Sequence, residues 1–323
     1  MLYLGIDLGG TNIKAAVVDG EGVIIKKGSH KTDAKRGSLY VIKDMGQLCV
    51  RLLEEAGIAL DGISAVGVGA PGTIDSDNGV VYYSNNLEWR NVPLADELRK
   101  IIDKPVYISN DANVAALGEA MFGASKGCTD SIFVTLGTGV GGGVILGGKL
   151  FEGNKSAGAE LGHVKLGDAK RQCTCGRYDC WETYSSATAL IRDTKEAMRR
   201  NKNSAMWELA GELDKVDGRT AFTCAKHGDS AAQAVVNEYL YYLGEALINL
   251  ANVFRPQKIL IGGGISGEGE YIIKPLQKSM DECIYGGQQA ASVRVELASL
   301  KNDAGILGAA ALAVSHSTVK EQK

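Results

Sequence analysis

The feature that most constrains the fold is a strand–glycine–strand pattern that occurs twice in a chain of 323 residues. The copies begin with LYLGIDLGGT at residue 2 and with SIFVTLGTG at residue 131. Aligning the two glycine turns matches four pairs of residues: Leu8 with Leu136, Gly9 with Gly137, Val17 with Ile145 and Gly20 with Gly148. The match favours two parts built on one plan, although glycine-rich hairpins also resemble one another by chance.

Short apolar strands lead into helices in both halves of the sequence. Apolar residues at helical spacing predict helices at 39–57, 112–122, 234–254 and from 304 onward. Runs of branched apolar residues predict further strands at 65–70, 105–109, 258–266 and 292–299. This alternation is typical of an α/β protein, and its occurrence in both halves favours two lobes.

The charge balance and the N-terminus exclude several classes of partner. The formal net charge is −3, so a broad nucleic-acid-binding surface is not expected. The start, MLYLGIDLGG, lacks the features of a signal peptide, and no apolar run reaches membrane-spanning length. We therefore expect a cytoplasmic protein without a membrane or nucleic-acid partner. There, the seven cysteines are expected to be thiols or metal ligands.

The first glycine turn, Asp7-Leu8-Gly9-Gly10-Thr11-Asn12, has the composition of an anion-binding turn. Its paired glycines let backbone amides approach an anion, and Thr11 adds a hydroxyl donor. Asp7 is suited to hold a water of a bound magnesium ion. An ordinary hairpin turn uses the same residue types, so both interpretations stay open. Walker and dinucleotide motifs are excluded because Gly-Lys-Ser/Thr is absent and the turn leads into a strand.

Two later glycine groups fit the same interpretation. Gly137-Thr138-Gly139, in the second copy, is expected to bind a polyphosphate together with the first turn. The group Gly262-Gly263-Gly264 follows an apolar strand and either offers a flat opening for a nucleoside or forms a plain loop. Gly142 and Gly143 are interpreted as strand positions that pack closely against a neighbour.

The dipeptide Asn110-Asp111 closes a predicted strand and precedes a predicted helix. Both residue types cap helices, and capping alone would explain their presence. In the functional interpretation, Asp111 lies at the carboxyl end of a strand and accepts the proton of an attacking hydroxyl. Asn110 would then bind the neighbouring hydroxyls. The dipeptide by itself does not decide between the two interpretations.

The segment from Glu160 to Glu182 concentrates potential metal ligands. One histidine precedes a Cys-x-Cys-x4-Cys pattern, which gives the set His163, Cys173, Cys175 and Cys180. Such a set suits one tetrahedral zinc ion, and the alternative is a group of buried thiols beside an unrelated histidine. The two glutamates either offer acceptors to a polyhydroxylated ligand or are solvated charges.

In this order, the motifs resemble those of the ROK family of sugar kinases and repressors, and within it those of the bacterial glucokinases. The resemblance covers essentially the whole chain and rests on IDLGGTNIKAAVVD, VGVGAPGTID, NDANVAALGE, LGTGVGGG, GAELGHV, CTCGRYDCWE and ILIGGGIS. It implies an α/β fold of the actin-like, ribonuclease H-like ATPase type, with two lobes around a cleft. The expected smaller lobe is 1–115 with the C-terminal helix 304–323, and the larger lobe is 116–303 with the zinc-binding segment.

The resemblance also implies roles for individual residues. ATP with magnesium would bind at Asp7, Gly9, Gly10, Thr11, Asn12, Gly137, Thr138, Gly139, Gly263 and Gly264. The sugar would contact Asn110, Asp111, Glu160, His163 and Glu182, with Gly72 and Asn86 as further candidates. Asp111 would be the catalytic base, and a structural zinc would be bound by His163, Cys173, Cys175 and Cys180. Asp179 departs from the family pattern, which often has glycine there, and this leaves the conformation of its turn open.

Motifs and resemblance together predict an ATP-dependent hexose kinase of glycolysis, with a glucokinase that makes glucose 6-phosphate as the first choice. Kinases for N-acetylmannosamine, N-acetylglucosamine or fructose would share the same motifs, so the preferred hexose, its anomer and any regulation stay open. A sugar-responsive repressor is less expected, because the first turn begins within ten residues of Met1 and leaves no room for a preceding DNA-binding segment. The resemblance also implies a homodimer.

Overall fold

The computed structural model describes residues 1–321, without the side chains of residue 288 and of residues 318–321. These residues form two compact units. Unit 1 contains Met1–Thr129, Gly143–Ala159 and the chain from Ser299, and unit 2 contains Asp130–Gly142 and Glu160–Ala298. The expected lobes, 1–115 with 304–323 and 116–303, divide the chain at other places, and residues 322–323 lie outside the described residues.

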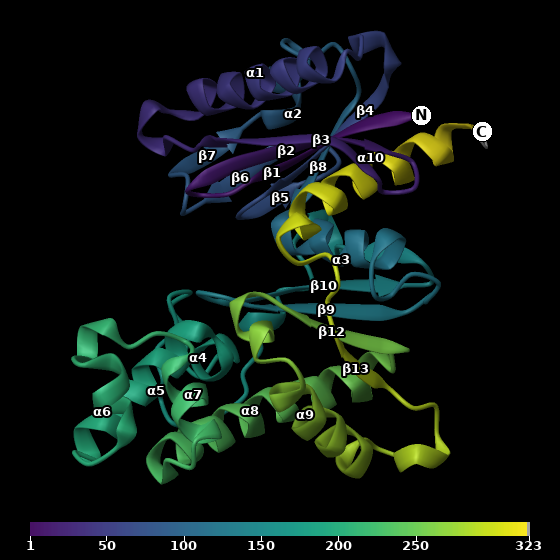
Figure 1. Cartoon of the computed structure of the whole chain (residues 1–323). Coiled ribbons are helices and arrows are strands. Elements are labelled where there is room, and N and C mark those ends of the chain that lie inside the picture. The colour runs from purple at the N-terminus through teal and green to yellow at the C-terminus, as the bar shows by residue number, and fades with distance from the viewer. Residues whose placement is uncertain (322–323) are drawn as a thin grey trace. The chain divides into compact units, whose positions relative to one another are not determined.

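Unit 1 is built on a five-stranded sheet with the strand order β3-β2-β1-β4-β8 (Figure 1). Its strands are β1 (Leu2–Leu8), β2 (Asn12–Asp19), β3 (Ile24–Lys31), β4 (Ile63–Ala70) and β8 (Val106–Asn110). Strands β1, β4 and β8 are parallel, whereas β2 and β3 run antiparallel to their neighbours. The carboxyl ends of three strands therefore meet at one edge, where α/β proteins place functional groups.

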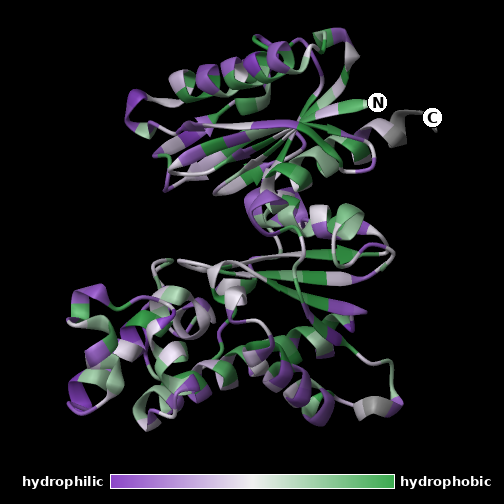
Figure 2. Cartoon of the chain, in the orientation of Figure 1, coloured by the Kyte–Doolittle hydropathy of each residue, from purple (hydrophilic) through white to green (hydrophobic). Residues whose placement is uncertain are grey.

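Helices cover both faces of this sheet (Figure 1). The amphipathic helix α1 (Ser38–Ala56) packs its apolar residues against β2 and β3 on one face and presents polar residues outward (Figure 2). On the other face, α10 (Ala304–Glu321) packs on β1 and β4 and beside α3 (Asp111–Phe122). Gly5 and Gly67 allow this close packing, because a Cβ at either position would overlap a carbonyl oxygen of α10. The same contact between α3 and α10 places all of α3 in unit 1.

The second five-stranded sheet has the order β11-β10-β9-β12-β13. Its strands are β9 (Ser131–Leu136), β10 (Val140–Leu146), β11 (Lys149–Phe151), β12 (Lys258–Gly262) and β13 (Arg294–Leu297). Strands β9, β12 and β13 are parallel, as β1, β4 and β8 are in the first sheet. Placing β9 on β1 thus reproduces the strand order of the first sheet, which supports the internal duplication expected from the sequence.

The chain between the metal-ligand segment and β12 is mostly helical. Its helices are α4 (Glu182–Ser185), α5 (Ala187–Arg200), α6 (Ala205–Ala210), α7 (Thr220–Lys226) and α8 (Ser230–Phe254), and α9 (Glu270–Cys283) follows β12. Helix α8 begins four residues before the expected start, because Asp229 caps it by accepting a hydrogen bond from Ala232 N. Neither α8 nor any other described helix is both long enough and apolar enough to cross a membrane.

A small three-stranded sheet in unit 1 was not expected from the sequence. Its order is β5-β6-β7, and its strands are β5 (Thr73–Asp75), β6 (Val80–Ser84) and β7 (Trp89–Val92), followed by helix α2 (Leu94–Arg99). Asp75 stabilises the turn between β5 and β6 by accepting hydrogen bonds from Asn78 and from the Tyr82 hydroxyl. Strands of three to five residues have too little periodicity to be found from sequence pattern alone.

Candidate active site

In unit 1, the first glycine turn joins β1 to β2 at the carboxyl edge of the sheet. Gly9 N donates to the carbonyl oxygen of Asn12 at 3.0 Å. The buried residue Thr32, directly after β3, supports the turn from the side: its N–H donates to Thr11 O and its hydroxyl donates to Gly9 O, each at 2.8 Å. Gly10, Thr11 and Asn12 remain exposed. The turn is therefore fixed from behind while its outer residues stay accessible.

Asp7 lies at the end of β1, next to the first turn of α10. Gly305 of that helix leaves room for the carboxylate, since a Cβ there would be 2.6 Å from Asp7 Oδ2. Burial raises the pKa of Asp7, and Lys14, whose Nζ is 3.9 Å from Oδ2, lowers it only in part. A bound cation would offset the cost of burying this charge. One carboxylate fits magnesium, which takes most of its ligands from phosphates and water.

The predicted sugar-binding residues of unit 1 lie along the same edge. Asn110 caps α3 by accepting from Ala112 N at 2.9 Å, and its Nδ2 donates to Gly72 O at 3.1 Å. Asp111, the first residue of α3, is exposed and also accepts from Ala112 N. The capping interpretation of Asn110 is therefore confirmed, but one N–H and one lone pair of its amide stay available to a ligand.

Two weaker candidates also have defined places in unit 1. Gly72 has a φ of +114°, and a Cβ there would overlap the carbonyl oxygen of Tyr83, so only glycine fits. Asn86 is exposed and lies beside the first turn, where its Cβ is 3.4 Å from the position of a Cβ on Gly10. The structure thus links Gly72 to Asn110 and Asn86 to the glycine turn.

Sequence reasoning missed a carboxylate that supports Asn110. Glu152 accepts hydrogen bonds from the hydroxyl of Ser109 at 2.5 Å and from that of Ser76 at 2.9 Å. Ser109 is fully buried and directly precedes Asn110, so Glu152 fixes the end of β8 to the end of β5. The sequence carried no signal for this contact, because Glu152 is 43 residues from Ser109.

In unit 2, the second glycine turn joins β9 to β10. Gly137 N, the counterpart of Gly9 N, donates within the turn to Gly139 O at 3.0 Å. Three further hydrogen bonds come from the segment around α4: Ala187 N to Gly137 O at 2.8 Å, the Thr188 hydroxyl to Thr138 O at 2.7 Å, and Val140 N to Glu182 Oε2 at 3.0 Å. Thr138 is exposed at the tip.

The third glycine group contacts the second turn directly. Gly263 has a φ of +81°, and a Cβ there would be 2.5 Å from the carbonyl oxygen of Leu136. Gly263 and Gly264 are exposed, so the predicted adenosine-side glycines adjoin the predicted phosphate turn within unit 2. Gly142 and Gly143 have the close-packing role expected of them, because a Cβ on either would come within 2.8 Å of Phe133 O or of the Ala116 side chain.

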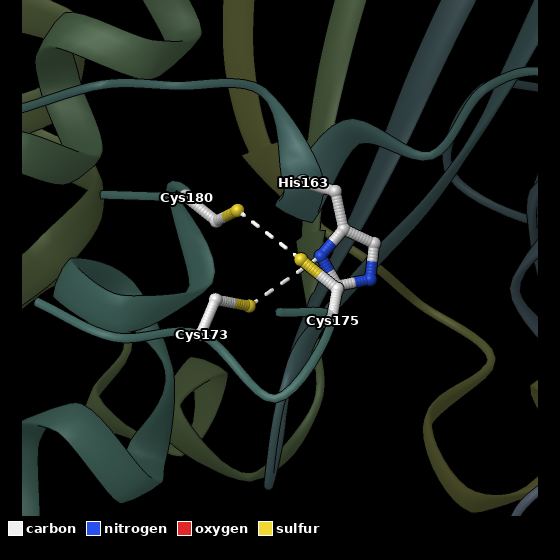
Figure 3. Close-up of side chains that lie close together, drawn as sticks. All are labelled: His163, Cys173, Cys175 and Cys180. Carbon is white, nitrogen blue, oxygen red and sulfur yellow. Dashed lines mark hydrogen bonds between the residues drawn. The ribbon is translucent and has the colours of Figure 1, made fainter. Parts of the chain in front are cut away.

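The three cysteines and the histidine of the cysteine segment converge on one point (Figure 3). The ligand atoms of His163, Cys173, Cys175 and Cys180 all lie within 4.8 Å of one another. His163 Nδ1 is 3.7 Å from Cys173 Sγ, and Cys175 Sγ is 3.6 Å from Cys180 Sγ. The interpretation as buried thiols with an unrelated histidine is therefore wrong.

The separations of 3.7 and 3.6 Å fit a tetrahedral zinc site. Sulfur ligands about 2.3 Å and nitrogen ligands about 2.0–2.1 Å from one ion lie about 3.6–3.8 Å from each other. All four ligand positions come from protein, as in structural zinc sites. Because His163 presents Nδ1 to the cysteines, its Nε2 is available for another partner. The backbone N–H of Arg177 lowers the pKa of Cys175, whereas burial raises the pKa of Cys173 and of Cys180. A bound metal ion would offset the cost of burying these thiolates.

The backbone of the metal segment is held by short antiparallel contacts. Trp181 N donates to Val164 O, and Leu166 N donates to Asp179 O, each at 2.8 Å. Glu160 is exposed before this segment, and Glu182 follows it at the start of α4. The structure therefore brings His163 and Glu182 to the metal cluster within unit 2.

Asp179 adopts the left-handed conformation that its position requires, with a φ of +62°. Its buried carboxylate accepts hydrogen bonds from Lys170 N, Arg171 N and the Tyr184 hydroxyl at 3.2, 2.9 and 2.7 Å. Burial raises its pKa, but these hydrogen bonds outweigh burial and keep the pKa of Asp179 below its ordinary value. The turn thus tolerates aspartate because the carboxylate is fully used.

Known proteins are similar to this chain over nearly its whole length. The model of the ROK family matches residues 3–316. The chain belongs to the ROK family. It is 38% identical over 312 residues to the glucokinase of Thermotoga maritima, covering 96% of each chain, and 36% identical over 310 residues to that of Halalkalibacterium halodurans, covering 95% of this chain and 93% of the relative.

A solved structure from the ROK family gives the same result. The ROK family glucokinase from Streptomyces griseus, in complex with glucose and AMPPNP, matches with a TM-score of 0.81 and 36% identity over 97% of this chain and 99% of that chain. The expected family and the expected actin-like α/β fold are thereby confirmed. The roles of individual residues stay predictions.

Proposed function

We propose that this ROK-family chain is an ATP-dependent hexose kinase that transfers the γ-phosphoryl group of ATP to the 6-hydroxyl of glucose. The observation that carries this proposal is the similarity to glucokinases, at 36–38% identity, over nearly the whole chain. Further support comes from residues suited to phosphate, to a proton and to sugar hydroxyls at the edges of the sheets.

The protein contributes to the reaction mainly by aligning the sugar hydroxyl with the γ-phosphoryl group of ATP. Asp111 accepts the proton of the attacking hydroxyl, and its exposed position at the start of α3 makes it accessible to a substrate. Asn110 is oriented by Gly72 and Ala112, and its remaining N–H and lone pair bind a neighbouring hydroxyl. The protein must also exclude water, because water competes with the sugar as phosphoryl acceptor.

The phosphates of ATP are bound by the two glycine turns in this proposal. The first turn contributes Gly9, Gly10, Thr11 and Asn12, the second contributes Gly137, Thr138 and Gly139, and the nucleoside lies beside Gly263 and Gly264. The carboxylate of Asp7 would hold a water of a bound magnesium ion. The ion would neutralise charge that develops on the phosphates.

The sugar is bound in unit 2 by Glu160, Glu182 and Nε2 of His163 in this proposal. Zinc bound at the Cys3His cluster would fix the ring of His163 and the start of α4, and with four protein ligands it supplies no activated water. Glu182 has one carboxylate oxygen engaged with Val140 N, so the other is the candidate for a sugar hydroxyl.

Two further expectations accompany the proposed activity. A homodimer is implied by the family resemblance, and analytical ultracentrifugation would test it. A cytoplasmic location is expected because the proposed reaction consumes ATP. Neither is needed for the chemistry described above.

A coupled assay of ATP consumption across a panel of hexoses tests the proposal. We expect glucose to give the highest kcat/KM among glucose, mannose, fructose, N-acetylglucosamine and N-acetylmannosamine. Asp111→Asn protein, purified in the same way, is the control for contaminating kinases. Higher kcat/KM with N-acetylmannosamine than with glucose would move the assignment to an amino-sugar kinase, and no turnover with any sugar would refute the kinase proposal.

A further inference from the structure

We propose that Glu182 is a positioning residue that couples zinc binding to nucleotide binding, because it ties the second glycine turn to the metal cluster. The inference rests on the proposed function, since it takes Gly137–Gly139 as a phosphate turn and the Cys3His cluster as the zinc site. It assigns Glu182 a task that is separate from contact with the sugar.

The side chain of Glu182 reaches both features. Its Oε2 accepts a hydrogen bond from Val140 N at 3.0 Å, directly after the turn. Its Oε1 lies 3.9 Å from Cys173 Sγ, one of the four ligand atoms. One carboxylate therefore spans the distance between a metal ligand and the backbone of the turn.

The turn is shaped to receive this carboxylate. A Cβ on Gly139 would overlap Glu182 Oε2, so only glycine allows the approach. A hydrogen bond from a backbone amide to a charged acceptor is stronger than one between neutral groups. Glu182 is thus a major determinant of where the end of the turn lies.

The position of Glu182 depends in turn on Cys180. Thr183, the next residue of α4, donates from its N–H and from its hydroxyl to Cys180 O, at 2.9 and 2.8 Å. A metal that fixes Cys180 would fix the first turn of α4 through these bonds. Glu182 would then be held in the orientation that meets Val140 N.

The other supports of the turn do not involve the metal cluster. Ala187 N and the Thr188 hydroxyl bind the carbonyl oxygens of Gly137 and Thr138 from the start of α5. These contacts should stabilise the turn whether or not zinc is bound. Thr188 therefore offers a matched control, because its loss weakens the turn without breaking the connection to the cluster.

Thermodynamic linkage makes the coupling measurable from either side. If zinc favours nucleotide binding through Glu182, bound nucleotide must favour zinc retention by the same factor. Zinc-loaded protein can therefore be used throughout, and no metal-free protein has to be prepared. The readout is the zinc itself, so it does not depend on catalytic activity.

The experiment measures zinc affinity by equilibrium competition with a chromogenic chelator, with and without saturating AMPPNP and in the absence of sugar. We expect AMPPNP to protect the zinc of the wild type by raising its affinity about five- to tenfold, within the usual range of coupling between sites. In Glu182→Ala, the ratio between the values with and without AMPPNP should fall to about one. Thr188→Val should need more AMPPNP for saturation but should keep the protection. Glu160→Gln should keep both the AMPPNP affinity and the zinc protection of the wild type.

Each outcome decides the inference. Equal protection in Glu182→Ala and in the wild type overturns it. Two results with the wild type also overturn it: no protection when AMPPNP is bound, and purified protein that contains no zinc. Failure of AMPPNP to bind wild type would instead contradict the proposed function. If Glu182→Ala does not fold, Glu182→Gln, which keeps an acceptor oxygen but no charge, replaces it: reduced protection supports the inference and full protection overturns it.

Discussion

The two glycine turns share a plan but differ in what supports them. In each, an internal hydrogen bond closes the turn, and a backbone N–H and a threonine hydroxyl donate to turn carbonyl oxygens. Thr32 supplies both donors in unit 1, from the end of a strand, whereas Ala187 and Thr188 supply them in unit 2, from the start of a helix. At the second turn, the carboxylate of Glu182 also accepts a hydrogen bond from Val140 N.

This difference shows how a duplicated fold acquires separate tasks. The strand order and the turn are common to both sheets, so they reflect the shared plan. The additions are not shared: unit 1 carries Asp111 at the start of α3, and unit 2 carries the metal cluster and Glu182. Loss of Asp111 should therefore affect mainly the reaction step, and loss of the metal cluster should affect mainly binding.

The largest effect is expected from Asp111→Asn in unit 1. The amide cannot accept the proton of the attacking hydroxyl, so kcat should fall by roughly the 10²–10⁴-fold that a general base contributes. Asparagine has nearly the same size as aspartate and keeps the place of the first residue of α3. Glucose binding, measured by calorimetry, should therefore change little. A variant with near-normal kcat would remove Asp111 from the role and with it the assignment of the chemistry to unit 1.

Cys175→Ser tests the corresponding claim for unit 2. A hydroxyl is a poor zinc ligand, so zinc affinity should fall by more than the roughly 10–100-fold that loss of an outer partner costs. Sugar affinity should fall with it, because His163 loses its fixed ring. Cys283→Ser is the matched control, since Cys283 is also free and exposed but lies outside the cluster. Full zinc occupancy in Cys175→Ser, measured by atomic absorption, would refute the ligand set.

Asp179→Gly tests how the metal segment is stabilised. Glycine removes the strain of the left-handed backbone but also removes the acceptor of three hydrogen bonds, among them that of the buried Tyr184 hydroxyl. The second effect is larger, so the free energy of unfolding should fall by about 1–3 kcal/mol. Urea unfolding of the zinc-loaded protein measures it. Unchanged or increased stability would mean that the network around Asp179 contributes nothing beyond the turn conformation.

The elements that the sequence predicted are those with strong local signals. The strands beside the glycine turns and the helices α1, α3, α8 and α10 appear within a few residues of their expected bounds. The β5-β6-β7 sheet was missed because its strands are short and are held by the side chain of Asp75, which no periodicity reveals. The residue pattern of the sequence therefore predicted the main strands and their glycine turns, whereas the small sheet depends on tertiary contacts that the pattern does not show.

The same division applies to the site. Metal ligands that are close in sequence were identified as one set, and their atoms converge in the structure. The supports of the site, such as Glu152 on Ser109 and Glu182 on Val140, join residues about 40 positions apart, and a single sequence contains no signal for such pairs. Capping by Asn110 was weighed against a role in binding, yet the structure shows that capping leaves part of its amide available.

Thr32→Val and Thr188→Val compare the two turns directly. Each change removes one hydroxyl donor to a turn carbonyl at nearly constant shape, and one such bond is worth about 0.5–1.5 kcal/mol. AMPPNP affinity, measured by calorimetry, should therefore fall about two- to tenfold in each variant. Loss in only one of them would mean that the turns do not share the nucleotide.

The smallest effect is expected at Ala159, a residue of unit 1 that is left-handed like Asp179 but lacks its hydrogen-bonding side chain. It has a φ of +60° directly before Glu160, and its methyl group offers no hydrogen bond in return for the strain. Ala159→Gly should raise the free energy of unfolding by about 1 kcal/mol, the usual cost of a left-handed alanine. Ala157→Gly is the control: Ala157 is exposed in the same loop with an ordinary φ of −105°, so glycine should lower stability there. The free energy of unfolding should therefore rise in Ala159→Gly and fall in Ala157→Gly and Asp179→Gly. This result would show that the left-handed conformation destabilises the protein at Ala159, whereas at Asp179 the hydrogen bonds of the side chain outweigh the strain.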